Sequence, residues 1–379
     1  MHSRSDFRRN VGAGIGGKYQ HRNVDTLEHL RQIRLEQTFA QTQQRGPLLL
    51  RRLEDLASVL LAPAANSHLP AVLKGFFDNG GERCFVACAD PGGDAESALA
   101  AALDGLAEVQ TLDLLALPDA MRLPAAAVLR LQARALAQAA RLGDRMVILD
   151  AVPGATPTDV LRQSRALTAG LGDVVNGALY FPWARNDAGA LVPPCGVVAG
   201  VIARTDASAG VFKAPANALL HGVVDLESVL DDAAQQPLND AGINCLRALP
   251  GRGIRIWGAR TLSRDPAWRH LSVRRLVLTL NRWIELNLGW ATFEPNTPRL
   301  WAQIERVLNR HLRGLWQAGA LRGGRAEQAV FVRCNADTSP AQARASGLLV
   351  TEIGLAPTAP AEFVLVRINL RSDAAAQPA

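Results

Sequence analysis

The chain has 379 residues, of which 48% are hydrophobic and 20% are charged. This is enough apolar material for two domains, or for one large and one small domain. No apolar run is long enough to cross a bilayer, and the arginine-rich start lacks the apolar core of a secretory signal. Neither a membrane-spanning protein nor export by the general pathway is therefore predicted.

The charges and the cysteines exclude further classes. The net charge of +6 comes almost entirely from arginines spread among acidic residues, whereas a nucleic-acid binder concentrates its basic residues on one strip. The five cysteines are odd in number and fall mainly in strand-like runs, which favours buried thiols over disulfides. Cys84 and Cys88 could form half of a metal site, but no second pair completes it. We predict no specific nucleic-acid partner, no metal and no other cofactor.

The first 44 residues are predicted to form a separate leader. Residues 12–18 (GAGIGGK) fit a dinucleotide-type glycine fingerprint and most of a phosphate-binding P-loop. However, residues 3–10 are too charged to form the buried strand that must precede such a loop, and Tyr19 stands where magnesium binding needs Ser or Thr. A glycine hinge is favoured, with a nucleotide-binding α/β enzyme as the alternative. Residues 25–43 are predicted to form a polar helix, either packed on a partner or solvated.

Short strand candidates alternate with helical runs in the middle of the chain, which predicts an α/β sheet. Strands are expected at 84–87, 111–117, 145–149 and 178–181, and helices at 70–78, 95–107, 124–142 and 158–171. Residues 184–194 contain prolines and are expected to form a surface excursion. Asp150 ends one of the strands and resembles the strand-end acid of many α/β enzymes, although capping a helix or forming a turn is the commoner role.

Apolar periodicity is sharpest in the last third of the chain. It predicts a strand near residues 252–262, a helix over 271–288, a second helix from Pro298, and strands at 329–334, 347–356 and 362–370. Asn281, Arg282 and Glu285 are expected to face water. Asn296 or Thr297 is expected to cap the second helix.

No catalytic set is found. Seven histidines are scattered along the chain, and Ser-His-Asp combinations can be drawn by chance in any chain of this length. His270 and His311 lie near or beside apolar stripes, so we interpret them as packing or surface residues.

Several ordered sequence blocks carry a family resemblance. In the last third they are residues 253–262 (GIRIWGARTL), 268–276 (WRHLSVRRL), 290–296 (WATFEPN), 300–301 (LW), 315–321 (LWQAGAL), 331–334 (FVRC) and 360–368 (PAEFVLVRI). Upstream they are residues 75–81 (GFFDNGG), 180–183 (YFPW), 192–194 (VPP), 196–200 (GVVAG), 203–206 (ARTD) and 210–217 (GVFKAPAN). Over residues 45 to 370 the chain resembles the contractile tail sheath proteins of phages, tailocins and phage-like injection systems.

The resemblance implies an α/β fold of the tail-sheath type, with a mixed sheet flanked by helices and a C-terminal strand suited to sheet augmentation between subunits. It implies a non-enzymatic subunit that polymerises helically around an inner tube and contracts to drive the tube through a target envelope. The implied partners are further copies of the chain, the tail tube protein, sheath paralogues, and baseplate and terminal cap proteins. A basic inner surface would meet an acidic tube surface.

The resemblance also assigns residues and domains. The expected inter-subunit strand comprises Phe363, Val364, Leu365, Val366, Arg367 and Ile368, and the expected core of the family motifs comprises Trp257, Trp268, Trp290, Phe293, Trp301 and Trp316. The expected domains are a leader (1–44), an α/β sheath domain (45–220), a C-terminal sheath domain (221–370) and a disordered tail (371–379).

The N-terminus departs from the family pattern. Sheath proteins usually open with an extended strand that joins the C-terminal strand in a neighbour's sheet, and this chain shows no such strand. A specialised sheath paralogue at the baseplate or the distal end is therefore the alternative. The resemblance also implies synthesis in the bacterial cytoplasm, assembly into a phage tail or phage-like particle, and release by lysis. It does not separate phage, tailocin and injection system.

Overall fold

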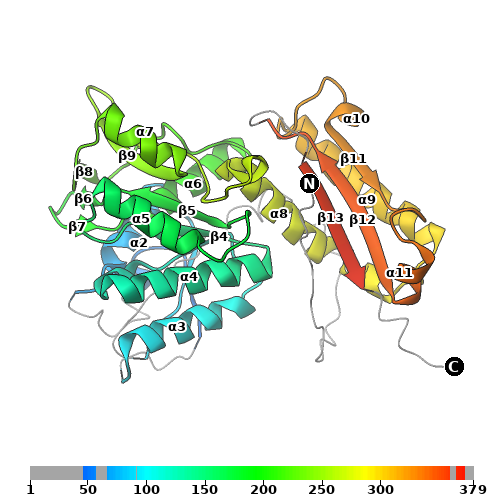
Figure 1. Cartoon of the computed structure of the whole chain (residues 1–379), viewed down its shortest axis with the longest axis horizontal. Coiled ribbons are helices and arrows are strands. Elements are labelled where there is room, and N and C mark those ends of the chain that lie inside the picture. The colour runs from blue at the N-terminus through cyan, green and yellow to red at the C-terminus, as the bar shows by residue number, and fades with distance from the viewer. Residues whose placement is uncertain (1–45, 57–65, 91, 359–363, 372–379) are drawn as a thin grey trace. The chain divides into compact units, whose positions relative to one another are not determined.

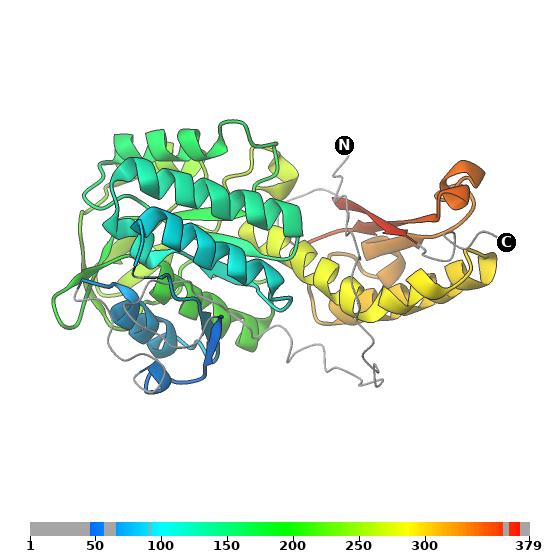
Figure 2. The same cartoon turned by 90° about the horizontal axis from the view of Figure 1, so that it is seen from below.

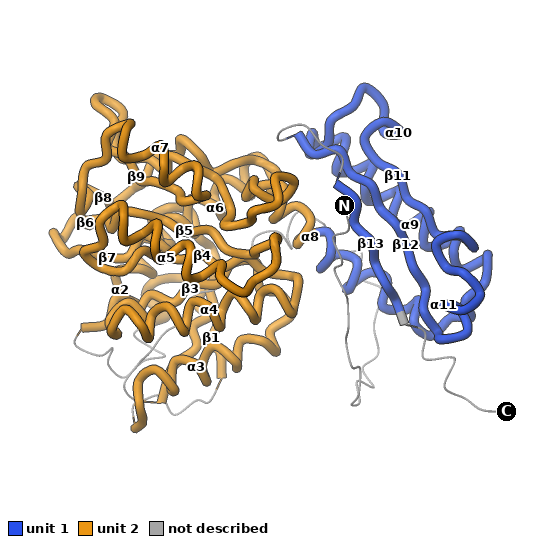
Figure 3. Tube along the Cα trace, viewed as in Figure 1, with its two compact units in different colours: residues 1–25, 280–379 blue, residues 26–279 orange. Residues whose placement is uncertain are grey.

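The computed structural model describes residues 46–56, 66–90, 92–358 and 364–371. The described chain divides into a larger compact unit that ends at Thr279 and a smaller one that begins at Leu280 (Figure 3). The domain boundary expected after residue 220 lies inside the larger unit. The glycine-rich segment 12–18, the predicted helix 25–43, Phe363 and the tail from 372 lie outside the described residues.

A five-stranded mixed sheet lies at the centre of the larger unit. Its order is β10-β9-β5-β4-β3, in which the last four strands are parallel and β10 is antiparallel to β9. The strands are β3 Leu114–Ala116, β4 Met146–Asp150, β5 Gly177–Phe181, β9 Ile243–Leu249 and β10 Gly253–Trp257. The strand predicted at 84–87 does not join this sheet. It forms β2 Cys84–Val86, which pairs with β1 Leu48–Leu50 in a separate sheet.

Helices cover both faces of this sheet (Figures 1 and 2). One face carries α3 Ala95–Gly105, α4 Ala125–Leu142, α5 Pro157–Thr168 and α7 Asp232–Asp240, and the other carries α2 Leu69–Asp78 and α6 Cys195–Ala209. Alternate residues of each strand enter opposite cores: Met146 and Ile148 join the α2/α6 side, whereas Val147 and Leu149 join the other. The predicted α/β layering is thus confirmed, with two apolar cores.

Helix α6 was not predicted, because its sequence follows two prolines and contains Gly196 and Gly200. The structure uses these glycines for close packing. A Cβ on Gly196 would lie 2.2 Å from the carbonyl oxygen of Val72, and a Cβ on Gly200 would lie 2.4 Å from that of Phe76. The two helices α2 and α6 therefore approach at backbone distance, and this tertiary contact overrides the poor helix propensity of glycine.

The expected surface excursion at 184–194 is a hairpin in a small antiparallel sheet, and its turn, residues 187–190, is exposed as expected. Strand β6 Ala184–Asn186 lies between β7 Leu191–Val192 and β8 Val223–Leu226. Ala184 is fully buried, which a surface loop would not require.

In the smaller unit, three strands form an antiparallel sheet with α9 Pro298–Gln317 on one face (Figures 1 and 2). The strands are β11 Val330–Arg333, β12 Leu348–Leu355 and β13 Val364–Arg371, and the short helices are η5 Gly289–Phe293, α10 Ala326–Ala329 and α11 Ala341–Ala345. All three predicted strands are confirmed. Helix α9 begins at Pro298, as predicted, and Thr297 occupies the cap position without a side-chain hydrogen bond.

Helix α8 Leu271–Leu288 has the predicted bounds, and the boundary between the two units falls within it. The expectation that Asn281 and Arg282 face water was wrong, because their exposed fractions are 2% and 5%. The apolar stripe marks the most hydrophobic side of α8, but the helix is buried around most of its circumference. Glu285 is half-buried.

Candidate assembly surfaces

The carboxyl end of β4 is filled by the chain's own groups. The backbone N–H of Cys195, at the start of α6, donates to Oδ1 of Asp150 at 2.9 Å. Gln132 and Gln163 donate to the carbonyl oxygen of Asp150, and the indole of Trp183 donates to that of Ala151. Burial raises the pKa of the Asp150 carboxyl to about 7. Asp150 therefore caps a helix, the commoner of the two roles considered for it.

The strand order at this edge differs from that of doubly wound enzymes. Doubly wound enzymes bind ligands where the strand order reverses, whereas β3, β4, β5 and β9 follow one another in a single direction across the sheet. Among the described residues no cluster of three His, Cys, Asp or Glu side chains could hold a metal ion. None of the five cysteines, all of them in described ranges, forms a disulfide; four are buried and Cys88 is half-buried.

A buried ion pair joins two of the sequence blocks that carry the family resemblance, 203–206 and 268–276. Arg275 of α8 donates to both carboxylate oxygens of Asp206 on α6, at 2.8 and 2.5 Å, and both side chains are at least 96% buried. Its neighbour Arg274 donates to Asn176 at 2.6 Å and lies 4.7 Å from the ring centre of Trp268. Burial lowers the pKa of Arg274 to about 10. These residues anchor the first turns of α8 in the larger unit.

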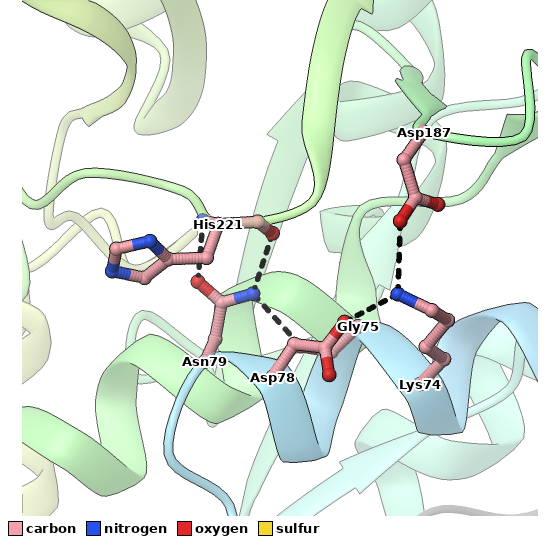
Figure 4. Close-up of polar contacts among 6 residues, drawn as sticks. All are labelled: Lys74, Gly75, Asp78, Asn79, Asp187 and His221. Carbon is pink, nitrogen blue, oxygen red and sulfur yellow. Dashed lines mark hydrogen bonds and ion pairs between the residues drawn. The ribbon is translucent and has the colours of Figure 1, made fainter.

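The block 75–81 also has a structural role (Figure 4). The fully buried Asn79 side chain donates to the carbonyl oxygens of Gly75 and His221 and accepts from the backbone N–H of His221, each at 2.9 Å. Lys74 contacts Asp78 at 2.6 Å and Asp187, in the β6–β7 turn, at 3.0 Å. The end of α2 thereby holds two loops that are distant in sequence.

The six aromatic residues assigned to the motif core do not form one cluster. Trp268 and Trp301 are buried, while Trp257, Trp290 and Trp316 are half-buried. Trp257 and Trp268 belong to the larger unit and the other four to the smaller one. Phe293 lies in η5 and is 76% exposed, so it is not part of the core of the single chain.

Trp301 is fixed by a neighbouring motif residue. Its indole N–H donates to Oδ1 of Asn296 at 2.7 Å, and the amide of Asn296 donates to the carbonyl oxygen of Leu348 at 3.3 Å. Asn296 was one of the two residues expected to cap α9. It does not cap that helix, and its side chain instead joins the helix to β12.

His311 also lies in a packed environment, as interpreted from the sequence. Its ring stacks on Trp283 with centroids 3.8 Å apart and planes 8° apart. Burial lowers the pKa of His311 to about 4, so the ring is neutral at neutral pH.

The expected inter-subunit strand is β13, and in the single chain it pairs with β12 along its whole length, from Leu355↔Val364 to Leu348↔Arg371. Val364, Val366 and Ile368 point into the core with exposed fractions of 4%, 2% and 2%. Leu365 lies on the opposite face and is 36% exposed. Arg367 on that face forms an ion pair with Glu352 of β12.

The outer side of α9 carries a basic stripe that was not recognised in the sequence. Exposed polar residues recur every three or four positions, which places them on one helix face: Arg299, Gln303, Arg306, Arg310, Arg313 and Gln317. Arg313 contacts Glu327 of α10 at 3.5 Å. The same helical projection that gave the apolar stripe of α9 would have revealed this basic one.

The fold and these surfaces define a mixed α/β protein built from two compact units. The family model of the phage tail sheath protein central domain matches residues 92–262, and that of the phage tail sheath C-terminal domain matches residues 263–371. The chain belongs to the phage tail sheath protein family.

Solved structures extend this likeness over almost the whole chain. The anti-feeding prophage baseplate contains a chain that is 26% identical, with a TM-score of 0.75 and coverage of 94% of this chain and 99% of that one. The helical sheath of the same system in the contracted state is 28% identical, with a TM-score of 0.71 and coverage of 94% and 99%. The sheath complex of an extracellular contractile injection system, PVC, in the contracted state is 25% identical, with a TM-score of 0.72 and coverage of 89% and 91%.

A sheath tail protein from Desulfitobacterium hafniense shares the fold at 10% identity, with a TM-score of 0.66 and coverage of 95% and 100%. Among curated proteins, none matches this chain. The relatives are structural components of phage tail-like particles or of an extracellular injection system, and this chain is a contractile tail sheath subunit. Within the described residues, no helix has the length and apolar character needed to span a membrane.

Proposed function

We propose that this chain polymerises around an inner tail tube, contacts the baseplate and terminal cap proteins of its particle, and has no enzymatic activity. The observation that carries the proposal is its likeness, over 94% of its length, to a helical sheath in the contracted state. Contraction would be driven by more favourable subunit contacts in the contracted state. At the carboxyl end of β4, the polar groups of the strand are bonded to other groups of the same chain, which supports the absence of catalysis.

Strand β13 would link the subunits. It lies close to the C-terminus, and a strand there can pass to a neighbour without threading a loop. In an assembly of identical chains, β13 of one subunit can pair with β12 of its neighbour in the register that it has within one chain. Exchange of β13 between subunits would therefore conserve the backbone pairing and the ion pair between Arg367 and Glu352. Main-chain hydrogen bonds would then hold a mesh while the subunit bodies move.

The basic stripe of α9 would face the tube. Four arginines on one exposed helix face favour an acidic partner surface, and arginine suits paired contacts with carboxylates. Such a contact weakens as salt screens the charges.

Electron microscopy tests both contacts after co-expression with the cognate tube and baseplate proteins. The wild-type chain should form cylinders around tubes, and a chain truncated before Glu362 should form none. Replacing Arg299, Arg306 and Arg310 together by Gln should give sheaths that lack tubes. The matched control replaces Arg130, Arg134 and Arg141 of α4 by Gln and should leave tubes enclosed. Rings or monomers from the wild-type chain would overturn the proposal.

A second candidate function is that of a sheath paralogue restricted to the baseplate. The observation that favours it is the TM-score of 0.75 with a chain of the anti-feeding prophage baseplate. Gold labelling of tagged particles separates the two functions: label along the whole cylinder supports a main sheath subunit, and label at one end supports the paralogue.

Two further points remain proposals. We infer synthesis in the bacterial cytoplasm and release by lysis, because the similar solved chains belong to a prophage baseplate and to an extracellular contractile injection system. The nucleotide-binding alternative predicts thermal stabilisation by ATP or NAD that Lys18→Ala abolishes. The sheath function predicts no stabilisation in either protein.

A further inference from the structure

The sequence contains two Asn-Gly pairs, Asn79-Gly80 and Asn176-Gly177. This dipeptide is chemically labile, because glycine has no side chain to hinder attack of its backbone nitrogen on the side-chain amide of the asparagine. The attack releases ammonia and forms a cyclic succinimide, which water opens to aspartate or isoaspartate. Whether an Asn-Gly pair reacts in a folded protein therefore depends on how firmly the structure holds it.

The fold requires both residues of the first pair. The side chain of Asn79 donates to the carbonyl oxygens of Gly75 and His221 and accepts from the N–H of His221 (Figure 4). We call these three hydrogen bonds the Asn79 clamp, and among side chains of this length only an amide supplies two donors and an acceptor. Gly80 has a φ of +100°, and a Cβ there would lie 2.8 Å from Cβ of Arg204. The labile dipeptide is thus demanded by tertiary contacts.

In the closed conformation the first pair is held in a geometry that cannot react. At the ψ of 9° of Asn79, the backbone nitrogen of Gly80 nearly eclipses that of Asn79, so it is turned away from Cγ. The N–H of Gly80 also donates to the carbonyl oxygen of Phe77 at 3.1 Å. The reaction therefore requires both rotation about ψ and loss of the Asn79 clamp.

The second pair is bonded to three elements of the larger unit. The side chain of Asn176 donates to Ala139 of α4 at 2.9 Å and accepts from Arg274 of α8 at 2.6 Å. Its backbone carbonyl accepts from the N–H of Val147 in β4 at 2.8 Å. Because two helices and a central strand hold Asn176, its release requires the larger unit to unfold as a whole.

The first pair needs a much smaller opening. Asn79 follows the last residue of α2, and His221 lies in the loop before β8, residues 217–222, which we call the His221 loop. His221 and Gly80 are both exposed. Two of the three bonds of the Asn79 clamp go to His221, and exposed loops open locally at a lower free energy than central strands. Water also reaches Gly80, and the reaction needs water.

Conversion of Asn79 would make this opening permanent. An ionised aspartate has acceptor oxygens and no donor, so it would face the carbonyl oxygens of Gly75 and His221 without a hydrogen bond to either. Burial of a charge among acceptors is unfavourable. Residues 217–220 bond to the backbone of β10, so release of the His221 loop would also loosen the cover of that edge strand.

We propose that Asn79 is a site of spontaneous deamidation that becomes reactive when the His221 loop opens, and that its conversion releases this loop from α2. The nitrogen of Gly80 loses its proton to water and bonds to Cγ of Asn79, the Cγ–Nδ2 bond breaks, and the amide nitrogen takes up a proton and leaves as ammonia. Water then adds to one succinimide carbonyl, and the ring opens to aspartate or isoaspartate. The inference goes beyond the proposed function and does not rest on it.

Incubation of the full-length protein at pH 8 tests which pair reacts. Samples are digested with pepsin at acid pH, where deamidation is slow, and mass spectrometry measures the converted fraction of each asparagine. In the folded protein Asn79 should convert at least about tenfold faster than Asn176, because local opening is more frequent than global unfolding. In urea the two should convert at similar rates. Equal rates in the folded protein, or no conversion of Asn79 while the unfolded chain converts, would overturn the inference.

A proline variant tests the Asn79 clamp. His221→Pro removes the N–H that donates to Oδ1 of Asn79 and leaves the Asn-Gly pair intact, so Asn79 should convert about fivefold faster. Conversion of Asn176 should stay the same. The matched control is His221→Ala, which should leave both rates unchanged because the imidazole points away from the Asn79 amide (Figure 4). An unchanged rate in His221→Pro would show that the clamp does not control the reaction.

The effect of the product is measured separately with Asn79→Asp, which also applies if His221→Pro does not fold. Hydrogen exchange of the His221 loop should rise about tenfold in this variant. In the control Asn176→Asp, where Arg274 remains a partner, the loop should exchange as in the wild type. Exchange of β4 reports whether either variant unfolds the larger unit. Unchanged exchange of the loop in Asn79→Asp would refute its release, and none of these results bears on whether the chain forms cylinders.

Discussion

The two principal sheets of this protein use their polar groups in opposite ways. In the larger unit the buried polar groups bond within the same unit: Asp150 caps α6, and Asn176 and Asp206 hold the arginines of α8. In the smaller unit Ser339 and Asn296 close one edge, and at the other edge the eight residues of β13 pair with no further described strand.

This difference separates folding from assembly. Buried polar groups that are satisfied within one unit fix that unit's own structure and offer nothing to a partner. An exposed strand edge contributes less to the stability of the single chain but provides directional contacts between chains. In a sheath subunit we expect the larger unit to serve as a rigid body and the smaller unit to carry the connections.

The largest expected effect comes from breaking the buried ion pair. Asp206→Asn leaves the Arg275 charge buried without its carboxylate, so the free energy of unfolding should fall by about 3–5 kcal/mol. The matched control is Asp232→Asn, because Asp232 contacts Arg247 but is 90% exposed, and its loss should cost less than about 1 kcal/mol. Urea unfolding of both variants measures the difference. Equal losses would contradict the view that the larger unit depends on internal polar contacts.

The second effect is a pH dependence in the larger unit. Burial raises the pKa of Asp150 from 3.8 to about 7, so the folded state holds this proton more tightly than the unfolded state. The free energy of unfolding therefore falls as the pH rises from about 4 to about 7. Asp150→Asn keeps an oxygen acceptor for the N–H of Cys195 and should remove this decrease. Urea unfolding at pH 5 and pH 8 tests it, and the same decrease in both proteins would count against the assignment.

The smallest of the three effects has the opposite sign and belongs to the smaller unit. Burial lowers the pKa of His311 from 6.5 to about 4, so protonation favours the unfolded state. Stability is complete above about pH 6.5 and is lost as the pH falls towards 4. His311→Phe keeps a ring on Trp283 and should remove this loss. Hydrogen exchange of α9 and β12 at pH 5 and pH 7.5 reports on this unit alone, and an unchanged pH response in the variant would refute the prediction.

Local sequence patterns predicted the elements that are amphipathic or clearly apolar. The bounds of α8, the start of α9 at Pro298 and the strands β11, β12 and β13 follow from periodicity and turn residues, which act over a few neighbouring positions. These patterns gave wrong or missing predictions where contacts with a segment distant in sequence determine the local structure. Helix α6 exists because its glycines meet α2, and the strand near residue 85 joined β1 rather than the large sheet.

The sequence by itself determined the family, the α/β layering and the apolar stripes, because each depends on residue order and local spacing. Only the tertiary structure decided that Asp150 is a helix cap, that Asn281 and Arg282 are buried, and that Phe293 is exposed. It also decided which edge of the smaller sheet is closed. These properties depend on groups brought together from distant parts of the chain, and the cost of burying a charge or leaving an edge unpaired is set by those groups.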